Sequence, residues 1–203
     1  MSQTFPITFT SLIGDIGSFS FSSPKIISTG QGGALITNDD ELSDKISKLK
    51  NFGRSGGGND IHTQFGINSK FTDLQAVIGI EQMKKLPWRI KRMREMWDLY
   101  YSRLSNHPNI MMFVARDDEW IPWFIDIYVD EPKTLQNYLK NKNIGTRVIY
   151  PQITSQLIYK QDKQYPVSEY YSKRGLWLPS STLLTNENIN EICDNIVLFF
   201  INS

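Results

Sequence analysis

Lys25 is the residue of this sequence whose surroundings best suit covalent chemistry. It follows Pro24, which ends regular strand pairing, and it precedes the turn-forming run Ser28-Thr29-Gly30-Gln31-Gly32-Gly33. Glycines let another group approach the backbone closely, and a lysine held partly out of water has a lowered pKa and a free amine for Schiff-base chemistry. Ser20, five residues earlier, can offer a hydroxyl to a phosphate. From these local features alone, a surface lysine in a hairpin and a solvent-facing strand serine are the commoner cases.

The composition narrows the class of protein. The chain has 203 residues, of which 40% are hydrophobic and 21% are charged, with 22 basic and 21 acidic side chains. This apolar fraction suffices for a packed core, and the balanced charge gives no general reason to expect a nucleic-acid or anionic-membrane partner. The single cysteine excludes a disulfide scaffold. No apolar stretch has the length of a membrane span and the first residues lack the basic region of a signal peptide, so we expect a cytoplasmic protein.

The elements that would position Lys25 are predicted to be a strand, a turn, a second strand and a helix. Phe19–Ser22 alternates apolar and polar side chains, and Ala34–Thr37 has the composition of a short strand. Asn38 predicts a helix start, and this helix should end near Gly53.

A second helix is predicted to start at Thr72, with Gln75 as its capping-box partner. Its body, Leu74–Ile80, is apolar almost all round, so we expect it to be buried on more than one side. Pro87 should break or restart the helix, and a long amphipathic helix should follow from Trp88 to Leu104. The apolar face of that helix is predicted to hold Ile90, Met93, Trp97, Tyr100 (or Tyr101) and Leu104.

The last part of the chain is predicted to alternate strands and helices. Trp123–Val129 and Thr146–Tyr150 have the pattern of strands, and Pro132–Lys142 and Thr185–Phe200 that of helices. This alternation predicts a compact two-layer α/β unit from Trp88 onward.

Other residues could in principle carry chemistry. A basic cluster follows Trp88 and could contact nucleic acid or a sugar diphosphate, although a solvated helix face is the commoner case. Its members are Arg89, Lys91, Arg92 and Arg94. His62 and His107 are too few to form a metal site, so we expect no bound metal. Cys193 lies among isoleucines on the last predicted helix and is expected in the core rather than as a nucleophile.

Three blocks of the sequence occur in an order that resembles one known family. The first runs from Gly14 to Gly33 and contains Lys25, and the second, residues 65–76, resembles a Gly-x-Asn-Tyr-Arg segment and the helix after it. The third comprises Thr146–Pro151 and Gly175–Ser180. Together they resemble the DegT/StrS-type (DegT/DnrJ/StrS) sugar aminotransferases, which are pyridoxal-phosphate enzymes of fold type I. The tail is most similar to the perosamine-synthase branch, which aminates a 4-keto-6-deoxy sugar nucleotide.

The resemblance implies an α/β fold: the C-terminal portion of a fold-type-I PLP-dependent transferase (aspartate-aminotransferase-like), with a partial large domain plus a small α/β domain. Lys25 would hold pyridoxal 5'-phosphate as an imine and move a proton during transfer from an amino-acid donor, usually glutamate. Ser20 would bind the cofactor phosphate, and Asn68 would reach the phosphate of the cofactor in the partner subunit of a homodimer. Tyr150 would contact the sugar-nucleotide substrate.

The chain also departs from the family pattern. The family carries a long N-terminal part of the large domain before the lysine block, including the acidic residue that protonates the pyridine nitrogen, and no residue here is assigned to that role. Ser69 stands where the family has a tyrosine. We therefore expect residues 1–86 to be a remnant of the PLP-binding large domain and residues 87–203 to be the small C-terminal domain. The exposed apolar surface left in the first third should be covered by a second copy or by a complementing chain with the missing half.

Three functions remain open from the sequence. The preferred one is PLP-dependent amino transfer to a keto-deoxy sugar nucleotide, as in surface-glycan biosynthesis, incomplete as a single chain. The second is a catalytically inactive truncated homologue that acts as an interaction or dimerisation module. The third is an unrelated small α/β binding domain in which Lys25 is ordinary. The first is preferred because Lys25 and Ser20 are both in place.

Overall fold

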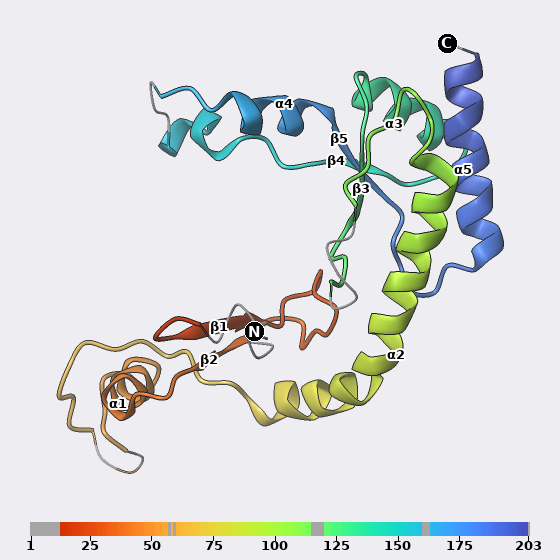
Figure 1. Cartoon of the computed structure of the whole chain (residues 1–203). Coiled ribbons are helices and arrows are strands. Elements are labelled where there is room, and N and C mark those ends of the chain that lie inside the picture. Colours follow the sequence, from red (N-terminus) through yellow and green to blue (C-terminus); the bar gives the residue numbers. More distant parts are fainter. Residues whose placement is uncertain (1–12, 57, 59, 115–119, 160–162, 203) are drawn as a thin grey trace, which may run out of the picture. The chain divides into compact units, whose positions relative to one another are not determined.

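The computed structural model describes residues 13–56, 58, 60–114, 120–159 and 163–202. The chain divides into two compact units, Met1–Leu86 and Pro87–Ser203, whose elements are labelled in Figure 1. None of the helices in the described ranges combines the length and the apolar character needed to cross a membrane. The prediction about a signal peptide concerns residues 1–12, which lie outside these ranges.

The first unit opens with a two-stranded antiparallel sheet. β1 (Gly17–Ser20) pairs with β2 (Gly33–Ile36) over their whole length. β1 begins two residues earlier than predicted and β2 one residue earlier. The strand cannot extend through Ser22 because the carbonyl of Ser22 accepts a hydrogen bond from the backbone N–H of Lys25 at 3.1 Å, which starts a tight turn.

The first helix of the unit, α1 (Asp40–Leu49), follows directly. Its N-cap is Asp39, whose carboxylate accepts a hydrogen bond from the backbone N–H of Leu42 at 2.9 Å. The start predicted from Asn38 is therefore one residue too early. Asp39 caps better because an ionised carboxylate also interacts favourably with the positive end of the helix dipole.

The longest helix, α2 (Asp73–Leu104), begins in the first unit and runs on into the second. The predicted capping box is confirmed, because Gln75 N–H donates to the hydroxyl of Thr72 at 3.3 Å and Thr72 N–H donates to the Gln75 side chain at 3.0 Å. The break or restart predicted at Pro87 is wrong, since Pro87 lies inside this helix. One missing backbone donor does not end a helix of 32 residues that keeps its hydrogen bonds on both sides.

The apolar first turns of α2 are exposed in the described chain. Leu74 exposes 81% of its surface, Val77 61% and Ile80 59%. The prediction that this segment is buried on more than one side is therefore wrong, because the first unit contains no element that covers it within the described residues. The uncovered apolar surface expected for the first third of the chain is present.

The second unit is built on a three-stranded antiparallel sheet. β3 (Ile125–Tyr128), β5 (Gly175–Leu178) and β4 (Arg147–Val148) lie in that order, so that β5 is central. The other elements are helices α3 (Pro132–Asn141), α4 (Pro166–Arg174) and α5 (Asn186–Ile201) and the short 3-10 turns η2 (Ile153–Ser155) and η3 (Leu157–Tyr159). The predicted strands and helices of this unit are present with shorter strands, and α4 was not predicted.

One face of this sheet forms the core. The alternating residues Ile125, Ile127, Leu176 and Leu178 are buried, together with the inward side chains of three helices. The helical core residues are Met93, Met96, Tyr100, Leu104, Leu135, Leu139, Ile189, Ile192, Cys193 and Ile196. The predicted two-layer α/β unit and the core position of Cys193 are thus confirmed. Burial raises the pKa of the Cys193 thiol to about 12, so the thiol stays protonated at neutral pH.

The basic cluster on α2 is not simply a solvated face. The guanidinium of Arg92 donates to the carbonyl of Leu184 at 2.5 Å and to the side-chain oxygen of Asn186 at 2.9 Å. Arg94 Nε donates to the carbonyl of Trp120 at 3.2 Å. For these two arginines the solvated-face interpretation is wrong, because each donates to backbone carbonyls of segments that pack beside α2.

Candidate functional site

Lys25 lies half-buried in the loop of residues 21–32 that joins β1 to β2. Two backbone hydrogen bonds close this loop at its base. Phe21 N–H donates to the carbonyl of Gly32, and Thr29 N–H donates to the carbonyl of Phe21, each at 2.9 Å. Both ends of the lysine-bearing segment are therefore held by the strands.

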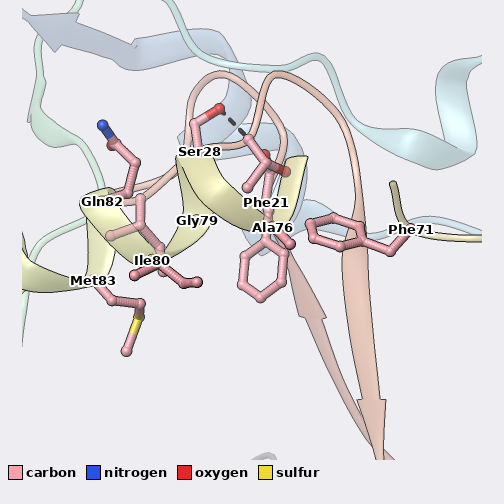
Figure 2. Close-up of a pocket in the computed structure, with 10 residues that line it drawn as sticks. Phe21, Ser28, Phe71, Ala76, Gly79, Ile80, Gln82 and Met83 are labelled. Atoms are coloured by element: carbon pink, nitrogen blue, oxygen red, sulfur yellow. Dashed lines mark hydrogen bonds between the residues drawn. The ribbon is translucent and has the colours of Figure 1, made fainter. Parts of the chain in front are cut away.

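Two serine hydroxyls donate hydrogen bonds to backbone carbonyls within the loop. Ser28 Oγ donates to the carbonyl of Phe21 at 3.2 Å, the bond drawn dashed in Figure 2. Ser23 Oγ donates to the carbonyl of Gly30, also at 3.2 Å. The Ser23 bond satisfies the carbonyl of Gly30, and the Ser28 bond gives the carbonyl of Phe21 a second donor beside Thr29 N–H. The loop consequently has a defined shape although it has no regular secondary structure.

Ser20 and Lys25 are tied together through Ser22. Ser20 Oγ lies 3.0 Å from Ser22 Oγ and accepts a hydrogen bond from Ser22 N–H at 3.3 Å. The carbonyl of the same Ser22 anchors the turn that ends at Lys25. Sequence reasoning missed Ser22, although two serines separated by one residue at a strand end are a recognisable signal for such a local side-chain bond.

The loop also packs against the start of α2. Gly32 adopts φ 132°, and a Cβ atom built there would lie 2.5 Å from the ring of Phe71. The ring of Phe71 meets Phe21 edge to face at 6.2 Å, and Gln75 Nε2 donates to the carbonyl of Gln31 at 2.8 Å. Glycine is required at position 32 because both its backbone angle and the available space exclude a side chain.

Replacing Gly32 with alanine is expected to destabilise the protein by about 1–3 kcal/mol, because the substitution combines a strained backbone with a clash against Phe71. Urea unfolding measures the effect. Gly56→Ala is the matched control, since a Cβ atom there meets nothing within 4 Å and no positive φ is involved. Equal midpoints for the two variants would contradict this account of the loop.

An apolar groove lies beside the lysine loop, between the loop and α2. It has a volume of about 390 Å³, and its walls include Phe21, Phe71, Ile80 and Met83 (Figure 2). None of the side chains that line it is charged. The groove therefore suits an apolar surface of a polypeptide rather than an anion or a sugar.

Asn68 belongs to a different segment of the first unit. This segment is extended and docks on the C-terminal end of α1, where Ile67 N–H donates to the carbonyl of Leu49 at 2.7 Å and Ser69 N–H donates to that of Lys50 at 3.0 Å. Asn68 itself pairs with Asn51 as an isolated bridge residue and is exposed.

Tyr150 belongs to the second unit and is also exposed. Its ring lies 4.8 Å from that of Trp177, and the guanidinium of Arg147 lies 5.3 Å from the Tyr150 ring centre. The four predicted site residues thus fall into a joined pair, Ser20 with Lys25, and two residues on other segments.

The donor set of the lysine loop defines what it could bind. It offers an amine on a half-buried lysine and two serine hydroxyls 3.0 Å apart, which suit an aldehyde and a phosphate respectively. Within the described ranges, no group of three or more histidine, cysteine or acidic side chains could hold a metal ion. The loop fits the aldehyde and phosphate ends of pyridoxal phosphate on the chemistry of these groups.

Comparison with known proteins identifies relatives of this chain. The chain is 32% identical over 196 residues to the GDP-perosamine synthase of Escherichia coli O157:H7, with 95% of this chain and 54% of the relative covered. It is 30% identical over 195 residues to the GDP-perosamine synthase of Vibrio cholerae, with 92% and 53% covered. The chain spans about half the length of the curated relatives it matches.

Solved structures share the fold. The aminotransferase TlmJ from Streptoalloteichus hindustanus superposes with a TM-score of 0.85 at 24% identity, over 93% of this chain and 53% of that one. A DegT DnrJ EryC1 StrS aminotransferase from Brucella abortus gives a TM-score of 0.81 at 25% identity, over 92% and 51%. These matches confirm the predicted fold class, a partial fold-type-I transferase. The sequence model of the DegT/DnrJ/EryC1/StrS aminotransferase family matches residues 10–197, and the chain therefore belongs to that family.

Proposed function

We propose that this chain forms part of a pyridoxal-phosphate-dependent aminotransferase that transfers an amino group, from glutamate, to a keto-deoxy sugar nucleotide. The observation that carries the proposal is the lysine loop, in which Ser22 ties Lys25 to Ser20. The names of the relatives, GDP-perosamine synthases, support a sugar nucleotide as the acceptor. The chain covers about half of each relative, so the activity is proposed for an assembly and not for this chain by itself.

Three side chains of the first unit would carry out cofactor binding and proton transfer. Lys25 Nζ would hold the cofactor covalently, and once released from that bond it would accept the proton from Cα of the amino donor. The hydroxyl of Ser20 would donate to the cofactor phosphate, and the exposed amide of Asn68 would donate to the phosphate in a partner subunit. When bound, the cofactor supplies an electron sink for the electrons left on Cα.

The proposed assembly includes a second polypeptide that covers the apolar groove. We take it to correspond to the part of the relatives that this chain does not span, since that part is about as long as this chain. It would bury the exposed side chains of Leu74, Val77 and Ile80 and supply the acidic side chain that protonates the pyridine nitrogen.

A complex is therefore expected when the full chain is mixed with the N-terminal half of the E. coli GDP-perosamine synthase, made as a separate polypeptide. Light scattering should show a complex that contains the two polypeptides in equal numbers. Val77→Lys should weaken it at least tenfold, since burying a valine is worth about 1.5–3 kcal/mol and a buried unpaired charge costs more.

Val167→Lys is the matched control, because Val167 is a comparably exposed helical valine in α4 of the second unit. A mass that reports only a second copy of this chain, weakened by Val77→Lys, would replace the proposed occupant of the groove with a homodimer contact.

The same mixture of the two polypeptides can be assayed for amino transfer. Transfer of an amino group from glutamate to a GDP-linked 4-keto-6-deoxy sugar, present only when both polypeptides are added, would support the proposal. Covalent capture of pyridoxal phosphate on Lys25 without any transfer would instead support the non-catalytic interaction module.

A further inference from the structure

The lysine loop, residues 21–32, is joined to α2 through the backbone carbonyl of Gln31. This carbonyl accepts a hydrogen bond from Nε2 of Gln75 at 2.8 Å and another from the hydroxyl of Thr29 at 2.7 Å. Thr29 itself is buried. Two donors use both lone pairs of the carbonyl, so Gln31 is held from the loop side and from the helix side at once.

The side-chain amide of Gln75 makes two different kinds of contact. Its oxygen accepts hydrogen bonds from the backbone N–H and the hydroxyl of Thr72, both at 3.0 Å, and so caps the start of α2. Its nitrogen is the donor to Gln31. These partners fix which way the amide points, because a backbone N–H needs an acceptor and a carbonyl needs a donor. A glutamate at this position could therefore replace the oxygen but not the nitrogen.

Gly79 lets the loop lie directly on the next turn of α2. It follows Gln75 by four residues, so the two lie on the same face of the helix. A Cβ atom built at Gly79 would lie 3.2 Å from Cγ2 of Thr29. Figure 2 shows Gly79 on the helix, with Ser28 of the loop drawn beside it. Gln75 and Gly79 thus form the surface of α2 on which the lysine loop packs.

Hydrogen bonds inside the loop connect this contact to Lys25. The carbonyl of Gly30, the residue before Gln31, accepts a hydrogen bond from Ser23 Oγ at 3.2 Å. Ser23 lies in the tight turn that ends at Lys25. The bonds therefore lead from Gln75 through Gln31 and Gly30 to the turn of the lysine, and a displacement of Gln31 from α2 would displace that turn.

We propose that Gln75 is a positioning residue for the capture of pyridoxal phosphate by Lys25. The inference rests on the proposed function, because it concerns the amine that would hold the cofactor. Capture joins Lys25 Nζ to the aldehyde carbon, and both hydrogens of the neutral amine leave with the aldehyde oxygen as water. The bond forms only when the amine lies close to the aldehyde, so a loop held on α2 raises the fraction of molecules in which it can form.

The test compares Gln75→Glu with the parent, each as the full chain. The protein is treated with pyridoxal phosphate over a range of concentrations and reduced with borohydride, and the label on the peptide that contains residue 25 is measured by mass. Gln75→Glu should need about fivefold more cofactor for half-maximal label, the factor that corresponds to one hydrogen bond of ordinary net strength. The cap of α2 should survive, because glutamate is a capping-box residue.

Amide hydrogen exchange of the chain without cofactor is a second readout. The N–H groups of Phe21 and Thr29 close the base of the loop. In Gln75→Glu they should exchange about fivefold faster, because the loop opens more easily once its bond to α2 is lost. Unchanged exchange of these two amides would overturn the positioning role.

Gln64→Glu is the matched control. Gln64 Nε2 also donates to a backbone carbonyl of the first unit, that of Lys45 in α1 at 3.2 Å, so this variant makes the same chemical change and adds the same charge. It should leave the label on Lys25 unchanged. Gln75→Met has neither a donor nor a charge and should show the same fivefold effect as Gln75→Glu, whereas parent-like labelling of Gln75→Met would assign the effect to charge and overturn the proposal.

Thr72→Ala separates positioning from stability. It removes the capping hydroxyl and keeps the amide of Gln75, so it should lower the midpoint of urea unfolding without changing the label. An equal loss of label in Thr72→Ala and Gln75→Glu would report stability alone and overturn the proposal, as would equal labelling of Gln75→Glu and the parent. A parent chain without label at residue 25 would overturn the proposed function and this role with it, so the two failures give different results.

Discussion

Lys25→Ala is expected to abolish the covalent capture of pyridoxal phosphate by this chain. Only a lysine amine can form the bond proposed for this loop, and Ser22 ties the same turn to Ser20, whose hydroxyl is proposed to bind the cofactor phosphate. The measurement is reduction of the cofactor-treated protein with borohydride, followed by digestion and mass determination of the peptide that contains residue 25. In the assembly with the second polypeptide, amino transfer should fall by at least about 10²-fold, the usual contribution of a positioned proton-transfer group.

Lys45→Ala provides the matched control for this variant. Lys45 is an exposed lysine of α1 in the same unit, so its removal should leave the labelled peptide and the amount of label unchanged. A second variant, Lys25→Arg, keeps the positive charge but has no amine that can be deprotonated, and it should behave like Lys25→Ala. Label spread evenly over several lysines of the parent chain would contradict a dedicated cofactor site.

Leu176→Ala is expected to cost about 2–5 kcal/mol of the free energy of unfolding, the range for fully buried leucines. Leu176 is fully buried on the central strand β5, opposite Ile127 of β3 and Val148 of β4, and the space it fills touches both neighbouring strands. Urea unfolding followed by tryptophan fluorescence measures the loss, because the rings around Trp177 report on the same sheet.

The same substitution at an exposed leucine calibrates this result. Leu183 exposes 85% of its surface, so Leu183→Ala should change the midpoint of unfolding little. Similar losses for the two variants would mean that the second unit does not have its core on this face of the sheet.

The sequence predicted secondary structure correctly where it depends on hydrogen bonds between residues close together in the chain. The helix predicted at Thr185 starts there, because Thr185 and Asn188 form a capping box and Thr185 accepts a hydrogen bond from the Asn188 N–H at 3.2 Å. The turn at Pro24 and the positive φ of Gly32 are likewise local requirements of a tight loop. Such interactions span a few residues and are therefore visible in the sequence.

Three predictions made from the residues' own preferences were wrong. Pro87 did not end α2, the apolar segment after Thr72 was not buried, and Arg92 did not remain on a solvated face. Pro87 is tolerated because one missing backbone donor does not end a long helix, whereas the other two outcomes depend on what packs beside the residue. Local propensity is a weak guide where tertiary contacts supply or withhold a partner.

The order of residues by itself determined the lysine-bearing loop, the strand and helix alternation of the second unit except α4, and the membership of a family. It did so because loops, caps and apolar periods are set by residues close together in the chain. Only the tertiary structure brought the amide of Gln75 to the carbonyl of Gln31, since no local pattern encodes a contact between residues 44 positions apart. The tertiary structure also decided which apolar side chains are buried, because burial depends on elements distant in sequence that meet only in the folded chain.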